Sequence, residues 1–266
     1  MMKIGFIADN DLPGIESDAR FCAEHGISGL EFNYWSALSD LTPEFVAQMR
    51  ATLDKYRVEC STLGLWGWNH TAVDAAEQAR ALKELDCLVE YGKVLGAKVL
   101  ITSGGNRPDQ SIAENVAAFA AVFPPYLERL EAAGMKLSIY AVHGNTFTVD
   151  EASYEALWAQ FPTVGIKCDP ANLRHAGLDY LGFLHRHGGH INHMHVKEHL
   201  YFGDELVSQP AAGMGDIEWG KVFAFLYEHG YNGYLTIEPH GGPWTRPPLR
   251  YKGILLAKKC IEQFLV

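Results

Sequence analysis

The chain has 266 residues, of which 48% are hydrophobic, and a formal net charge of −10 at pH 7. This length suits one large α/β domain as well as two small ones. The acidic balance disfavours binding to a phosphate backbone, which needs a basic face, so we expect no nucleic-acid partner.

Hydropathy and cysteine usage indicate the cellular compartment in which we expect the protein. No run of about 18 apolar residues occurs, so we expect no membrane span. The first residues, MMKIGFIADNDLPG, reach polar turn residues too soon for a signal peptide. The five cysteines are widely spaced without a C-x-x-C pair. This usage favours reduced thiols in a cytoplasmic protein over disulfides or a thiolate zinc site.

Short apolar runs of strand length alternate with helical patterns along the whole chain. The predicted strands are 3–8, 29–33, 59–65, 98–103, 136–140, 163–167, 191–196 and 233–238. The predicted helices are 15–26, 43–57, 74–95, 111–133, 150–160, 178–187, 217–229 and 248–264, and Pro124 and Pro125 should kink or split the fourth. Eight such units predict an α/β fold, a (β/α)8 TIM barrel formed as a single domain by residues 1–266.

A doubly wound sheet is the rival fold, but the first strand is followed by IADNDLPG and not by a G-x-G-x-x-G turn. The strand-to-helix connections are longer than the helix-to-strand ones. In a barrel these longer loops form the C-terminal mouth, where active sites are built.

Three successive predicted strands end in a carboxylate or an imidazole: Asp169, His195 and Glu238. Each has a simpler explanation, because Asp169 could cap the turn before Pro170, a strand histidine is usually only hydrogen-bonded, and Glu238 could be salt-bridged. Their recurrence favours one shared divalent metal site. Imidazole suits zinc, manganese or cobalt, and carboxylates shift the preference toward manganese or magnesium.

Further candidates follow the same strand ends. His143 comes after the fifth strand as a fourth metal ligand or an acid/base group, or only as a turn residue. His193 shares one strand face with His195, and Lys197 follows as a candidate oxyanion partner. Glu31 ends the second strand, where it could bind a hydroxyl or orient a ligand.

Aromatic and polar residues in the predicted mouth loops suit a sugar. Flat rings pack against the apolar face of a sugar ring while polar neighbours bond its hydroxyls, although loop aromatics can equally serve an oligomer interface. The remaining candidate substrate-binding residues are Trp66, His70, Asn172, Trp244 and Arg246. A homo-oligomer is therefore possible.

Four motifs carry a resemblance to a known family: GLEF on the second strand, CDPAN on the sixth, HMHVKE on the seventh, and GMGDIEWGKVFAFLYEHGYNGYLTIEPH through the eighth. Together they resemble the xylose isomerase-like TIM-barrel superfamily, the sugar phosphate isomerase/epimerase group. The resemblance extends over almost the whole chain. It implies a divalent metal held by Glu, Asp, His and Glu from strands five to eight.

Carried onto this sequence, the resemblance assigns Asp169, His195 and Glu238 as metal ligands, but the fifth-strand glutamate falls at Ala141. Family epimerases use two glutamates as paired acid/base groups, so this change puts a standard two-base epimerisation in doubt. Relatives that lack this glutamate, such as inosose dehydratases, carry tyrosine and histidine nearby, as Tyr140 and His143 do here.

The first hypothesis is a metal-dependent sugar isomerase or epimerase acting on a keto sugar through an enediolate, with Glu238, His143 and Lys197 as catalytic groups. A dehydratase or lyase acting by β-elimination is its runner-up. A DNA-repair nuclease of similar fold would need more ligands and a basic groove. A non-catalytic sugar-binding or partner subunit, with a decayed site at Ala141, is the remaining alternative.

Overall fold

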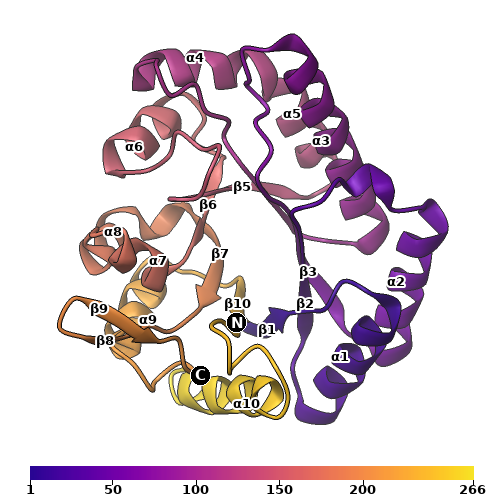
Figure 1. The fold of residues 1–266 in the computed structure, drawn as a ribbon, viewed down its shortest axis with the longest axis vertical. Helices are drawn as coiled ribbons and strands as arrows, with labels where there is room; N and C mark the ends of the chain where they lie inside the picture. Colours follow the sequence, from indigo (N-terminus) through magenta and orange to yellow (C-terminus); the bar gives the residue numbers. More distant parts are fainter.

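The protein is a closed barrel of eight parallel strands surrounded by helices (Figure 1), described over residues 1–266 in a computed structural model. The strand order around the barrel is β1-β10-β7-β6-β5-β4-β3-β2. The strands are β1 (Lys3–Ile7), β2 (Gly29–Tyr34), β3 (Glu59–Leu65), β4 (Val99–Thr102), β5 (Lys136–Tyr140), β6 (Gly165–Cys168), β7 (Ile191–Val196) and β10 (Tyr234–Ile237). The predicted α/β TIM barrel is confirmed.

Helices lie between successive strands on the outside of the barrel. They are α1 (Leu12–His25), α2 (Pro43–Tyr56), α3 (Ala75–Leu95), α4 (Ile112–Val122), α5 (Pro124–Ala132), α6 (Glu151–Gln160), α7 (Pro170–His175), α8 (Tyr180–His187), α9 (Trp219–Glu228) and α10 (Leu249–Glu262), with short 3₁₀ turns at Leu38–Asp40 and Gly188–His190. The longest, α3, begins after an Asp74 cap and ends at Gly96, which adopts a left-handed conformation. The helix predicted at 111–133 is divided at Pro124, because proline cannot donate the backbone hydrogen bond that continues a helix.

The sequence patterns did not predict two elements at the C-terminal mouth. The segment after β7 carries an antiparallel hairpin of β8 (Leu200–Phe202) and β9 (Glu205–Ser208). The short helix α7 starts directly after β6, so Asp169 lies at a strand end and a helix N-terminus at once. No helix has the length and apolar character needed to cross a membrane.

The inside of the barrel is divided between apolar and ionisable side chains. Trp66, Val99, Ile101 and Tyr140 form a separate buried cluster from strands β3 to β5. Tyr140 is paired in register with Lys167 on β6, and Lys167 with His193 on β7. Because neighbouring residues in register point to the same side of a sheet, the ionisable half of the barrel begins where this apolar cluster ends.

A buried ion pair joins the first and last helices around the closed barrel. The fully buried carboxylate of Asp18 on α1 accepts hydrogen bonds from Arg250 on α10 at 2.6 and 2.9 Å and from the Tyr251 hydroxyl at 2.8 Å. It also accepts from the backbone N–H of Asp9 at 2.9 Å. These contacts attach α10 to the loop that follows β1.

We expect Asp18→Ala to lower the free energy of unfolding by about 3 kcal/mol, because it leaves the largely buried Arg250 guanidinium without its partner. Urea unfolding followed by circular dichroism measures the change. Glu16→Ala, which breaks the exposed pair with Lys55, is the matched control and should unfold at nearly the wild-type midpoint. Equal midpoints for the two variants would contradict this role of Asp18.

Candidate functional site

Three strand ends bring Asp169, His195 and Glu238 together at the C-terminal mouth. One potential ligand atom from each residue lies within 4.8 Å of the other two. His195 Nδ1 is 2.6 Å from Glu238 Oε2. Asp169 Oδ1 caps α7 by accepting from the Asn172 backbone N–H at 3.0 Å, which leaves Oδ2 facing the interior of the site. The capping interpretation of Asp169 is thus correct, and it is compatible with a ligand role for the second oxygen.

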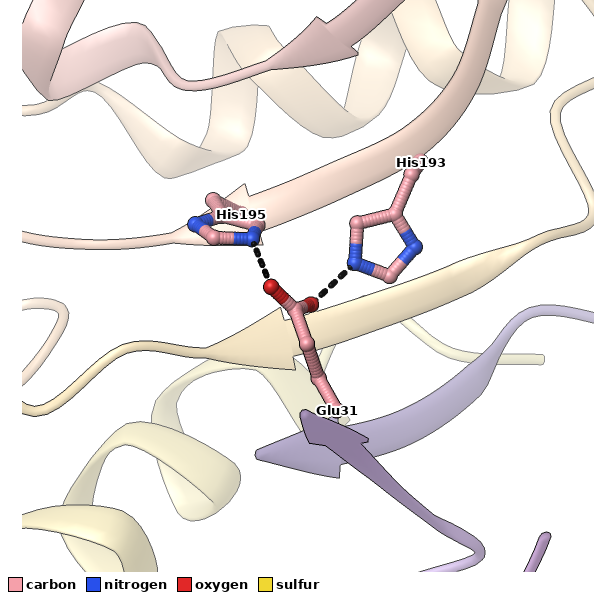
Figure 2. Close-up of side chains that lie close together, drawn as sticks. All are labelled: Glu31, His193 and His195. Carbon is pink, nitrogen blue, oxygen red and sulfur yellow. Dashed lines mark hydrogen bonds and ion pairs between the residues drawn. The ribbon is translucent and has the colours of Figure 1, made fainter. Parts of the chain in front are cut away.

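Below this group, a fully buried carboxylate joins the two histidines of β7 (Figure 2). Glu31 Oε2 is 2.5 Å from His193 Nε2, and its Oε1 is 2.8 Å from His195 Nε2. Both imidazoles donate their Nε2 hydrogens to this carboxylate, which fixes the ring of His195. The Nδ1 side of His195 therefore points toward Glu238, with which it hydrogen-bonds, and a carboxylate of this kind behind a metal-binding imidazole is a common arrangement.

The electrostatics of this network favour charged groups despite their burial. Burial disfavours the Glu31 carboxylate, but His195 and His193 hold its pKa well below the usual range. Burial likewise opposes protonation of His195, yet Glu31 raises its pKa above 6.5. Burial lowers the pKa of His193, so the second imidazole stays neutral over a wider range.

Two lysines reach into the same group of carboxylates. Lys167 Nζ lies 3.3 Å from Asp169 Oδ2, and both side chains are almost completely buried. Lys197 Nζ donates to Glu238 Oε1 at 3.2 Å and to Asn172 Oδ1 at 3.1 Å. Burial opposes the charge on Lys167, but Asp169, Glu238 and Glu31 together raise its pKa, so it remains an ammonium.

A cavity of about 440 Å³ opens above these groups and gives them access to a small molecule. Its walls combine aromatic faces with imidazole, amide and ammonium groups, and the β8–β9 hairpin contributes to one side. The lining residues include Trp35, Trp66, His143, Lys167, Asn172, Lys197, Gln209 and Glu238. A larger cavity of about 570 Å³ lies at the other end of the barrel beside Lys3, Lys98 and Lys136, away from this group of residues.

His143 lies at the edge of the cavity beside the aromatic wall. Its ring is edge-on to Trp66 and Tyr140, and its Nε2 is 3.3 Å from Asn172 Nδ2. Burial and the nearby Lys167 ammonium lower its pKa to about 4, so the imidazole is neutral at pH 7. The three-residue cluster of potential ligands does not include it.

The other candidate residues divide between the cavity and its surroundings. Trp66 and Asn172 line the cavity, and Trp66 stacks on Tyr140 at 4.4 Å between ring centroids. Glu31 and His193 lie beneath it, in the barrel interior. Three candidates lie apart from the cavity lining: His70 is buried against Thr102 and the Ala81 carbonyl, Trp244 packs near Gly253, and Arg246 is exposed.

Sequence reasoning missed Lys167, although its signal was present. A lysine in the apolar run GIKC, two residues before Asp169, must share the inward face of β6 with that carboxylate. Ala141, where the family pattern has glutamate, is buried and carries no ligand atom.

Comparisons with known proteins agree with the barrel fold. A family model described as a xylose isomerase-like TIM barrel matches residues 19–260. The chain belongs to this family. The inosose dehydratase of Geobacillus kaustophilus is 26% identical over 148 residues, which are 50% of this chain and 47% of that protein, so the match spans about half of that relative.

Two solved structures have the same fold over nearly their whole length. The IOLI protein with a bound zinc atom superposes with a TM-score of 0.80 at 16% identity, covering 99% of this chain and 98% of that one. A D-allulose 3-epimerase from Methylomonas sp. in complex with D-allulose gives a TM-score of 0.75 at 17% identity, covering 98% and 96%. At these identities the likeness establishes the barrel fold.

We expect Glu31→Gln to lower the free energy of unfolding by about 3–5 kcal/mol, because the buried imidazoles lose their charged partner. The Glu31 contribution is complete above pH 4.5 and is lost as pH falls through its lowered pKa. The His195 contribution is complete below pH 6.5 and is lost as pH rises through its raised pKa.

The difference in unfolding free energy between wild type and Glu31→Gln should therefore be greatest between pH 4.5 and 6.5 and should decrease at higher pH. Urea titrations at a series of pH values, without added metal, measure it. A difference that grows steadily above pH 6.5 would contradict the charged Glu31–His195 pair.

Proposed function

We propose that this protein is an enzyme that transfers a proton at the carbon next to the carbonyl of a keto sugar or related polyol, as a metal-dependent isomerase or epimerase. The observation that carries the proposal is the convergence of Asp169, His195 and Glu238 beneath a cavity with aromatic and hydrogen-bonding walls. The family membership and the sugar-binding and dehydratase relatives support the same class of chemistry.

The donor set fits a divalent cation of the manganese, magnesium, cobalt or zinc type. Two carboxylates and one imidazole offer ligand atoms within 4.8 Å of one another, and Glu31 fixes the imidazole from behind. When bound, such a cation polarises a carbonyl and makes the neighbouring C–H acidic. Asp169, His195 and Glu238 would hold it, and His143 is not a member of this three-residue cluster.

The chain's own groups supply the proton transfers. Neutral His143 can accept a proton through a ring nitrogen, since its lowered pKa leaves that nitrogen free at pH 7. Glu238, which also lines the cavity, provides the second acid/base group. Lys197, held by Glu238 and Asn172, presents an ammonium to the negative oxygen that develops beside the reacting carbon.

The alanine at position 141, in place of the family glutamate, favours β-elimination as a second candidate reaction. Without a carboxylate on β5, the second proton acceptor of a two-base epimerisation must come from another group, such as His143. A dehydratase needs one base at carbon and one acid at the leaving hydroxyl. Neutral His143 can take the proton from carbon and then, once protonated, return it to the leaving hydroxyl, which departs as water. The similarity to an inosose dehydratase supports this alternative.

The test is a screen of neutral keto sugars, keto sugar phosphates, keto sugar acids and keto-inositols with each of the four metals, followed by NMR in D₂O. Epimerisation or isomerisation gives an isomer with deuterium at one carbon, whereas elimination gives a product that has lost water. We expect Asp169→Asn and His143→Gln to reduce kcat/KM about 10²–10⁴-fold.

The matched control is Lys93→Met, which changes an exposed residue on α3 and should retain wild-type kcat/KM. The absence of solvent deuterium in any sugar, with every metal, would reject the proposed function. Deuterium incorporation that survives His143→Gln unchanged would instead reject the role of His143 alone.

A further inference from the structure

The carboxylates of the candidate metal site already have positive partners from within the chain. Asp169 faces the Lys167 ammonium at 3.3 Å, and Glu238 faces the Lys197 ammonium at 3.2 Å. Three of these four side chains are at most 5% exposed, and Glu238 is 13% exposed. Two negative and two positive charges therefore balance here, and the Glu31 carboxylate, 2.8 Å from His195 Nε2, offsets the charge of the third candidate ligand when that imidazole is protonated.

A divalent cation entering this balanced group would leave an excess of positive charge among side chains that are at most 13% exposed. Charges that are buried without a counterion are strongly unfavourable, and the repulsion between a cation and two ammonium groups is weakly screened there. The alanine at position 141 adds to this excess of positive charge, because the family pattern has a glutamate carboxylate at the end of the fifth strand and Ala141 offers none. The protein alone thus provides too little negative charge for tight divalent binding.

We propose that the missing negative charge comes from the substrate, which is an anionic sugar carrying a carboxylate or phosphate group and not a neutral keto sugar. This inference rests on the proposed function and narrows its substrate class. The divalent cation and the anionic sugar then bind with positive cooperativity, since each supplies the charge that the other needs.

The cavity provides a place for such an anion. Lys167 and Lys197 both line it, and Glu238 is the one carboxylate among its lining residues. The Lys167 ammonium also lies 5.4 Å from the centre of the Trp66 ring, so the charge and the aromatic face adjoin one another. Trp66 is itself covered by Tyr140 and Trp35, so the exposed indole of Trp35 is the aromatic face left for a sugar ring, while an acidic group meets the ammonium.

Lys167 is the specificity-determining residue in this account. Replacing it by methionine keeps most of its volume in the buried strand but removes its charge. Asp169 then loses its internal partner and becomes available to the cation, so Lys167→Met should bind metal more tightly without any sugar. The same variant should lose most of its preference for an anionic over a neutral sugar.

The experiment is calorimetric titration of the metal-free full-length protein with MnCl₂, alone and with saturating D-fructose, D-gluconate or D-fructose 6-phosphate. We expect weak Mn²⁺ binding alone and with fructose, and at least tenfold tighter binding with one of the two anionic sugars. The gluconate and phosphate arms distinguish a carboxylate from a phosphate as the source of the charge. Lys167→Met should bind Mn²⁺ at least tenfold tighter than wild type without sugar, and Lys93→Met should match wild type.

Tight Mn²⁺ binding to wild type that is equal with and without anionic sugar would overturn the charge-balance inference while leaving the proposed metal-dependent enzyme intact. The same conclusion follows if fructose and gluconate strengthen Mn²⁺ binding equally. No Mn²⁺ binding under any condition, together with no deuterium exchange in the substrate screen, would overturn the proposed function as well. Thermal unfolding of each variant confirms that altered binding does not reflect loss of the fold.

Discussion

The pairing of Glu31 with His193 and His195 is the constraint on which the rest of the site depends. A carboxylate at the centre of a barrel is unfavourable unless hydrogen-bond donors surround it, and β7 supplies two imidazoles from alternate positions of one strand. The hydrogen bonds to the Glu31 carboxylate occupy the Nε2 atom of each imidazole ring. His195 is thereby left with only Nδ1 to offer the mouth, where Asp169 and Glu238 converge. The orientation of the candidate ligand is thus determined from below, by a residue outside the cavity.

The same need for hydrogen-bond partners explains why the ionisable groups of the barrel interior gather on one side. The apolar cluster of Trp66, Val99, Ile101 and Tyr140 fills the half formed by β3 to β5. The opposite half contains ionisable groups that hydrogen-bond to one another. The two halves meet at Asn33, whose Oδ1 accepts a hydrogen bond from Trp66 Nε1. Gly64 leaves the space for this contact, because a Cβ at position 64 would lie 2.3 Å from Asn33 Oδ1. Asn33 in turn donates to Glu31 at 2.8 Å, so the aromatic wall and the charged network form one connected structure.

The sequence predicted the barrel well because strand and helix periods alternate without interruption, and β3, β5 and β7 begin and end where the apolar runs do. It also predicted the convergence of Asp169, His195 and Glu238, since parallel strands of a barrel end at one mouth. The β8–β9 hairpin escaped prediction although Gly203-Asp204 is a typical two-residue turn between strand-like runs. Contacts between distant strands, such as Glu31 with His193, depend on barrel closure and register, which no local pattern encodes.

The replacement at Ala141 and the presence of Lys167 act in the same direction. One leaves no carboxylate at the end of the fifth strand, and the other adds a positive charge on the sixth, where Lys167 pairs in register with Tyr140, the residue before Ala141. A site changed in this way cannot keep the charge balance of a three-carboxylate metal centre. Either the balance is restored by another anion, or divalent binding is weak; the 440 Å³ cavity beside both lysines makes a bound anion the simpler solution. The proposed chemistry at the carbonyl then needs no other change, because the proposed acidic sugar brings the charge that a neutral sugar would lack.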